Sequence, residues 1–160
     1  MKQLIVLVLI LSGLPLMTGC SSQSNAQDVP SAIPPEAQFY SLHSGAPIAS
    51  SSKSQKVIKV LETQQDYVTT LAEYSNDAPK AVDFSKGRVL VVARGWAPTP
   101  GDGIQVSSVD VRNTYVVANV ELTVPGCAQA QVLSYPYQFV FIPTTKTILF
   151  SEKMVTYACP

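Results

Sequence analysis

The feature that most restricts the fold is an uninterrupted apolar run, residues 89–93, which leads through a short loop into a second apolar segment starting at Ile104. A short run of this kind, rich in valine, predicts a buried strand. The loop, residues 95–103, holds two prolines and three glycines, which punctuate the backbone closely enough to order it. We therefore expect a buried strand, an ordered loop and a returning strand.

This loop is the candidate contact surface. Trp96 is its one large apolar side chain, and it sits where neither face of a strand easily buries it. We predict that the loop binds a partner through Gly95, Trp96, Pro98, Thr99, Pro100, Gly101 and Asp102. The alternative is that Trp96 folds back over the open end of the sheet as a lid on the core.

The second half of the chain reads mainly as strands. Residues 104–111 and 114–124 predict a hairpin, and the second strand places Val116, Ala118, Val120 and Leu122 on one all-apolar face. Residues 137–142 are apolar on both faces. Two shorter strands are expected at residues 147–150 and 154–158.

The first half contributes two strands and a helix. Residues 38–42 resemble an edge strand, and residues 56–61 a second strand. Thr63 with Asp66 three residues later is typical of a helix start, and the spacing of Tyr67, Leu71 and Tyr74 predicts an amphipathic helix over residues 64–74. The fold class is therefore α+β, a mainly antiparallel sheet curled into a small sandwich or half-barrel with one amphipathic helix.

The N-terminal region predicts export and anchoring. Lys2 precedes an apolar stretch, residues 4–17, that is too short to span a bilayer, so residues 1–19 are expected to be a signal peptide. Gly19-Cys20-Ser21-Ser22 resembles a bacterial lipobox, in which the cysteine is acylated, for example with palmitate. An ordinary signal peptide with an incidental cysteine is the alternative. Ser21 favours the outer membrane, facing the periplasm or the cell surface.

Residues 20–35 read as the lipidated cysteine and a flexible tether, because their polar, proline-containing composition cannot bury enough apolar area to order. Residues 36–160 then form one domain. Two cysteines remain after Cys20, namely Cys127 and Cys159, and in an oxidising envelope compartment we expect them to form a disulfide.

The sequence offers no recognisable catalytic, metal or cofactor site, and we predict a non-enzymatic protein. No nucleophile elbow, zinc-protease motif, phosphate loop or dinucleotide fingerprint occurs, and the one histidine, His43, is expected in a loop near a glycine. The scattered carboxylates are expected on a solvated surface: Asp83, Asp102, Asp110, Glu121 and Glu152. Zero formal net charge without a basic stripe argues against nucleic-acid binding. The aromatic set Tyr135, Tyr137, Phe139 and Phe141 is expected to pack in the core.

A family resemblance runs from about residue 40 to 153. The order Val82-Asp83-Phe84-Ser85-Lys86, a hydrophobic strand, Gly95 before Pro98-Thr99, the hairpin, Pro125-Gly126-Cys127, Tyr135-Pro136-Tyr137 and Pro143 resembles the C-terminal domain of the PrcB family. That family is named for a lipoprotein subunit of a bacterial surface protease complex. It tends to carry Gly-Gly-Tyr where this chain has Pro100-Gly101-Asp102, so its aromatic residue is missing here.

The resemblance implies an interaction module that binds or supports a protease or another envelope protein. A second hypothesis is a protease inhibitor, since the rigid Pro-Thr-Pro-Gly-Asp-Gly loop of residues 98–103 faintly resembles that of chagasin-like inhibitors. A third is an enzyme whose site has no recognisable motif.

Overall fold

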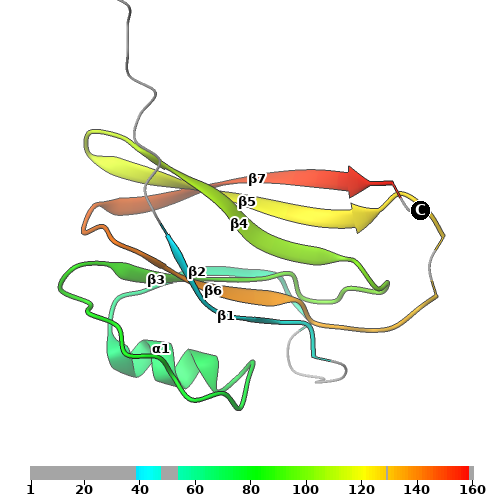
Figure 1. Ribbon diagram of the computed structural model, residues 1–160, viewed down its shortest axis with the longest axis horizontal. Coiled ribbons are helices and arrows are strands. Elements are labelled where there is room, and N and C mark those ends of the chain that lie inside the picture. Colours follow the sequence, from blue (N-terminus) through cyan, green and yellow to red (C-terminus); the bar gives the residue numbers. More distant parts are fainter. Residues whose placement is uncertain (1–38, 48–53, 129, 159–160) are drawn as a thin grey trace, which may run out of the picture. The chain divides into compact units, whose positions relative to one another are not determined.

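The computed structural model describes residues 39–47, 54–128 and 130–158, which form seven strands and one helix. The strands are β1 (Tyr40–Gly45), β2 (Val57–Leu61), β3 (Arg88–Ala93), β4 (Gly103–Val111), β5 (Tyr115–Pro125), β6 (Tyr137–Ile142) and β7 (Thr147–Tyr157), and the helix is α1 (Gln64–Leu71). One sheet has the order β1-β6-β3-β2 and the other β4-β5-β7. The two sheets lie face to face, and α1 covers the outer face of the four-stranded one (Figure 1).

The predicted fold class is confirmed. All strand pairs are antiparallel except β5 with β7, which run parallel in register from Tyr115 opposite Thr147 to Pro125 opposite Tyr157. The two sheets form a sandwich and do not close into a barrel. One expectation is wrong: the two short strands at residues 147–150 and 154–158 are one continuous strand, β7.

Two apolar clusters fill the spaces between the layers. The cluster between the sheets contains Val116, Ala118 and Val120 of β5, which confirms the expected core face of that strand. The cluster between the four-stranded sheet and α1 contains Tyr67, Leu71, Tyr137 and Phe139. Alternate residues of β6 therefore reach opposite clusters, as its apolar pattern on both faces predicted.

The helix and the first strand expected from the sequence are present, but their boundaries differ from those predicted. The Thr63 side chain accepts a hydrogen bond from the Asp66 backbone N–H at 3.1 Å, which is the expected helix cap. The helix ends at Leu71, before the expected residue 74, although Tyr74 still packs against the same cluster. The first strand lies at Tyr40–Gly45, later than expected, and forms one edge of the larger sheet.

Candidate functional site

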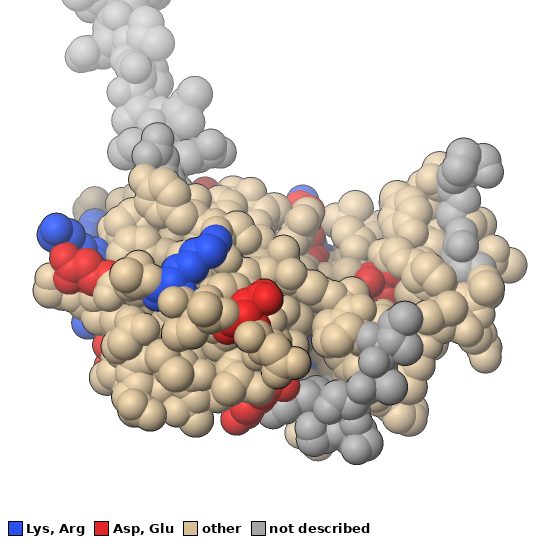
Figure 2. Space-filling view, turned by 60° about the horizontal axis from the view of Figure 1, so that its bottom comes forward, with Lys and Arg blue, Asp and Glu red and all other residues tan. Residues whose placement is uncertain are grey.

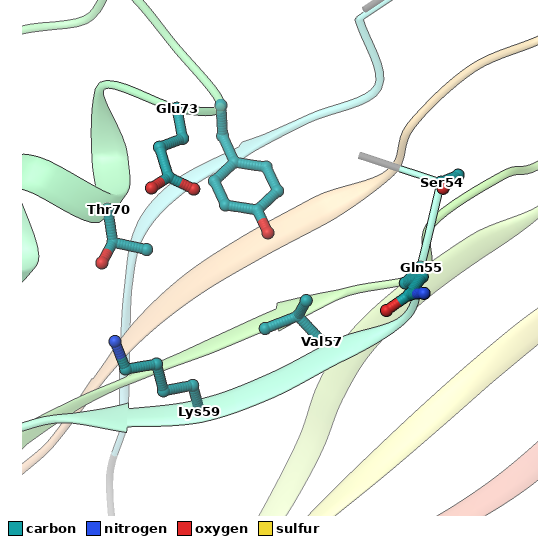
Figure 3. A pocket seen from close by; sticks show the side chains of 7 residues that line it. Ser54, Gln55, Val57, Lys59, Thr70 and Glu73 are labelled. Atoms are coloured by element: carbon teal, nitrogen blue, oxygen red, sulfur yellow. The ribbon is translucent and has the colours of Figure 1, made fainter. Parts of the chain in front are cut away.

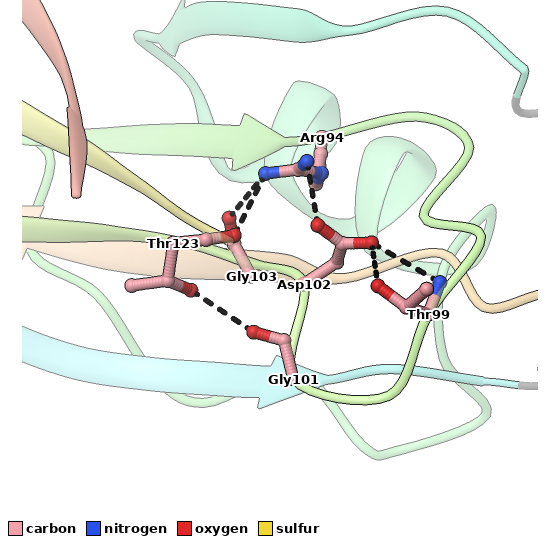
Figure 4. A network of polar contacts seen from close by, with 6 residues as sticks. All are labelled: Arg94, Thr99, Gly101, Asp102, Gly103 and Thr123. Atoms are coloured by element: carbon pink, nitrogen blue, oxygen red, sulfur yellow. Dashed lines mark hydrogen bonds and ion pairs between the residues drawn. The ribbon is translucent and has the colours of Figure 1, made fainter. Parts of the chain in front are cut away.

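The loop between β3 and β4 is anchored by a buried ion pair at its two ends. Arg94 follows β3 directly, and its Nη2 donates to Asp102 Oδ1 at 2.7 Å, with only 13% and 4% of the two side chains exposed. Arg94 Nη1 also donates to the backbone carbonyls of Gly103 at 3.2 Å and Thr123 at 3.0 Å (Figure 4). The guanidinium therefore joins the end of β3 to β4 and β5 of the other sheet.

The second oxygen of the Asp102 carboxylate orders the tip of the loop. Asp102 Oδ2 accepts from both the backbone N–H and the hydroxyl of Thr99 (Figure 4). The Asp102 N–H donates to the Thr99 carbonyl at 3.2 Å. Gly101, with φ of 93°, completes this turn in a conformation that other residues rarely adopt. Side-chain and backbone bonds together fix residues 99–102.

Gly95 lets the start of the loop approach the chain before β2. Its φ is 78°, and a Cβ added there would lie 2.7 Å from the Ser54 carbonyl oxygen and from the Gln55 carbonyl carbon. The Trp96 N–H donates to the same Ser54 oxygen at 3.4 Å. A larger residue at position 95 would therefore be excluded by backbone atoms as well as by its own dihedral angle.

Trp96 lies on this ordered loop with 59% of its surface exposed, so it is not a lid on the core. Its indole Nε1 donates to the hydroxyl of Tyr135 at 2.8 Å, and Tyr135 is itself only 5% exposed. Backbone bonds in both directions between Ala97 and Ser134, each 3.0 Å, hold the two segments together. The indole is thus exposed to solvent, and its hydrogen bond to Tyr135 fixes its orientation.

Two more exposed apolar side chains lie on the segment paired with the loop. Val132 and Leu133 are 38% and 39% exposed, and the Val132 N–H donates to the Pro98 carbonyl at 3.1 Å. We call Trp96, Val132 and Leu133 the Trp96 surface. Aromatic residues such as tryptophan are enriched in the cores of protein–protein interfaces.

Residues 88–143 match the PrcB C-terminal family. The resemblance expected from the sequence is confirmed for this part of the chain, which runs from β3 to the residue after β6 and is shorter than the expected span of 40–153. No curated protein and no solved structure matches the chain.

The PrcB-matched residues include the complete loop, Arg94, which anchors it, and Tyr135, which accepts the hydrogen bond from Trp96. Of the predicted contact residues, Trp96, Pro98, Pro100 and Gly101 are exposed, and Thr99 is partly buried. Gly95 and Asp102 are buried and shape the loop from inside. Sequence reasoning missed Arg94 and the support given by Tyr135. The one signal for Arg94 was a cation placed directly after a buried strand, where an unpaired charge is rare.

Two carboxylates outside the loop, Asp83 and Glu121, each accept hydrogen bonds from neighbouring side chains. Hydrogen bonds from Ser85 and Lys86 lower the pKa of exposed Asp83 below its usual value. A hydrogen bond from Lys153 lowers the pKa of Glu121 in the same way, with the Lys153 Nζ to Glu121 Oε1 distance at 2.7 Å. Of the five carboxylates expected on a solvated surface, Asp102 is buried, so the expectation is wrong for it, and the side chain of Glu121 is only 17% exposed.

His43 is a buried strand residue, not the loop residue that was expected. It lies in β1, outside the PrcB-matched residues, and its Nε2 is 2.8 Å from the hydroxyl of Tyr67 on α1. Its Nδ1 is 3.6 Å from Asp77 Oδ2. Burial raises the pKa of Tyr67, an effect partly opposed by the hydrogen bond from the Lys80 N–H. These contacts fasten α1 and the segment after it to β1.

Two surface hollows flank the four-stranded sheet. One, of about 360 Å³, lies between β2 and α1, with Lys59, Thr70 and Glu73 directed towards it (Figure 3). The other, of about 420 Å³, is more apolar and is lined by Tyr40, Leu42, Val82 and Phe141, among others. In the described ranges, no three His, Cys, Asp or Glu side chains gather as metal ligands.

Charge is scattered over the α1 side of the molecule. Figure 2 turns that side forward and shows basic and acidic side chains in small separate groups. Within the described part of the chain, no helix is both long and apolar enough to cross a bilayer. The predicted lipidation site, Cys20, and the disulfide partner Cys159 lie outside the described residues, so both assignments stay predictions.

Proposed function

We propose that this chain is a non-enzymatic subunit of a protease-associated complex, and that it contacts its partner through the Trp96 surface. The family match at residues 88–143 supports the association with a protease. The observation that carries the choice of surface is the 59% exposure of Trp96 on a loop held by a buried ion pair. Large exposed apolar patches mark protein-interaction sites, and Val132 and Leu133, on the segment paired with the loop, add their exposed side chains to that of Trp96.

The energetics favour this surface as a binding site. Tryptophan is enriched among interface residues whose truncation weakens binding by about 2 kcal/mol or more. Ordering a flexible side chain on binding costs roughly 0.5–1.5 kcal/mol. Here the hydrogen bond to Tyr135 restricts the indole before the partner arrives, which reduces that cost.

The test is a comparison of Trp96→Ala with Tyr115→Ala in affinity recovery from envelope extract, followed by titration with the recovered partner. Tyr115 is also an exposed aromatic residue, at 37%, but it begins β5 and lies outside the Trp96 surface. We expect Trp96→Ala to weaken binding at least about thirtyfold, equivalent to about 2 kcal/mol, with little change in melting temperature. Tyr115→Ala should bind normally. Equal binding by both variants would refute the proposal.

The inhibitor hypothesis stays open because the loop is rigid at both ends. It makes a different kinetic prediction. An inhibitor alone blocks turnover of a target protease stoichiometrically, whereas a supporting subunit leaves turnover intact or increases it. Titrating the purified chain into the recovered protease separates the two.

We also propose that the domain is held at the bacterial outer membrane by acylated Cys20 and a tether over residues 21–35. The support is the sequence Gly19-Cys20-Ser21-Ser22 after an apolar leader. The Cys20→Ala chain should accumulate as uncleaved precursor and should not partition into detergent as a processed lipoprotein. Normal cleavage and partitioning of this variant would contradict anchoring at Cys20.

A further inference from the structure

We propose that two copies of this chain associate through β7, joining their three-stranded sheets into one six-stranded sheet. β7 is eleven residues long and pairs with β5 along one side. Among the described residues, no strand pairs with its other side. Such an edge presents backbone N–H and C=O groups to which a further strand can bond.

The apolar core reaches the surface along this edge. Phe150 and Met154 stand in register with Ala118 and Leu122 of β5, so they belong to the face that packs between the sheets. They are nevertheless 50% and 69% exposed, because the opposite sheet ends at β2. On the other face of β7, Leu149 is 47% exposed.

The charges on β7 are already matched within one copy. Glu152, between Phe150 and Met154, forms an ion pair with Lys56, the residue before β2. Lys153, on the opposite face, pairs with Glu121 of β5 at 2.7 Å. Unpaired charges on an edge strand usually prevent strand addition, and internal pairing weakens that protection.

The side chains along β7 favour pairing with β7 of a second copy, and they favour one register of the two antiparallel strands. A two-fold axis at Glu152 would place Phe150 opposite Met154 of the second copy and Leu149 opposite its Val155, each pair occurring twice. Moving the axis by one residue would instead place Phe150 opposite Glu152 or Thr156. The Glu152 register alone of these three matches apolar residues with apolar residues on both faces.

In this register the two Glu152 side chains face each other, and each retains its own Lys56. One pair of edge strands buries little surface compared with the roughly 1,200–2,000 Å² of stable complexes. We therefore expect a reversible dimer whose population rises with concentration.

Cysteine cross-linking in the full chain tests the register. Directly opposite Cα atoms in an antiparallel pair lie about 4.5–5.5 Å apart, within the disulfide range of about 4.4–6.8 Å. Glu152→Cys should thus form a disulfide-linked dimer under mild oxidation, with residue 152 linked to itself in the mass spectrum. Ser151→Cys should not, because the two Ser151 positions would lie diagonally, about 7–8 Å apart. The unmodified chain, treated identically, controls for Cys20, Cys127 and Cys159.

Sedimentation velocity over a concentration series gives the independent test. We expect the unmodified chain to approach twice its monomer mass, and Met154→Lys to stay monomeric with an unchanged melting temperature. Leu133→Lys is the matched control on the Trp96 surface and should still dimerise. A monomeric wild type, dimerisation of Met154→Lys, or cross-linking of Ser151→Cys equal to that of Glu152→Cys would overturn the proposal. Should Met154→Lys fail to fold, the Glu152→Cys cross-link decides alone.

Discussion

Replacing Asp102 with alanine should make the β3–β4 loop mobile and destabilise the domain. The carboxylate has only 4% of its side chain exposed and accepts from Arg94 and from the backbone and hydroxyl of Thr99. Its removal leaves the Arg94 guanidinium, 13% exposed, without a counter-charge. The two carbonyl acceptors on Gly103 and Thr123 would remain.

The expected loss follows from these contacts. Removing one partner of a buried ion pair costs roughly 3–5 kcal/mol. We expect the lower end, about 3 kcal/mol, because Arg94 keeps its carbonyl partners. At about 3 °C per kcal/mol for a domain of this size, the melting temperature should fall by about 10 °C. Asp83→Ala is the matched control, since this carboxylate is exposed, and it should change stability by less than about 0.5 kcal/mol.

The assay can follow both the whole domain and the loop. Thermal unfolding by circular dichroism reports the domain, and the fluorescence anisotropy of Trp96, the one tryptophan in the chain, reports the loop. We expect Asp102→Ala to lower both the melting temperature and the native-state anisotropy. Equal melting temperatures for Asp102→Ala and Asp83→Ala, with unchanged anisotropy, would show that the ion pair does not hold the loop.

Three further changes test other parts of the structure. Gly101→Ala should destabilise the domain by about 1–2 kcal/mol, because the φ of Gly101 is 93° and an added Cβ would lie 1.7 Å from the Tyr157 hydroxyl oxygen. Urea unfolding measures the loss of stability, and an unchanged unfolding midpoint would contradict the prediction. Tyr67→Phe should lower the free energy of unfolding by about 1–3 kcal/mol by leaving His43 Nε2 and the Lys80 N–H without their partner, whereas Tyr115→Phe should not. Reducing the predicted Cys127–Cys159 disulfide should remove roughly 3.5–4 kcal/mol of stability, and two free thiols in native protein would refute the pairing.

The strands that were predicted well are those whose own apolar pattern indicates which residues are buried. β3 is apolar at every position after Arg88, and β5 alternates so regularly that its core face could be assigned before any partner was known. The Thr63 cap could also be predicted because it involves only residues three apart. Local periodicity and local hydrogen bonds are properties of a short sequence window.

The features that were missed depend on partners distant in sequence. The break expected within β7 falls at the polar residues Ser151, Glu152 and Lys153. In the structure, Lys56 pairs with Glu152 from 96 positions away, and β5 supplies Glu121 for Lys153, so an edge strand can carry these charges. His43 likewise looked like a loop residue because its buried partner, Tyr67, lies 24 positions further along the chain.

The position of Arg94 links the candidate site to the stability of the whole sandwich. Arg94 follows a strand of the four-stranded sheet, whereas its acceptors Gly103 and Thr123 belong to the three-stranded sheet. At the same end of the molecule, Gly101 lies against Tyr157 of β7, and Gly95 against the backbone that leads into β2. The loop therefore rests on both sheets, and losing the contact between the sheets would release it. A partner that binds the ordered loop would then also favour the docked sheets, so we expect saturating partner to raise the melting temperature of the wild-type domain and not that of Asp102→Ala.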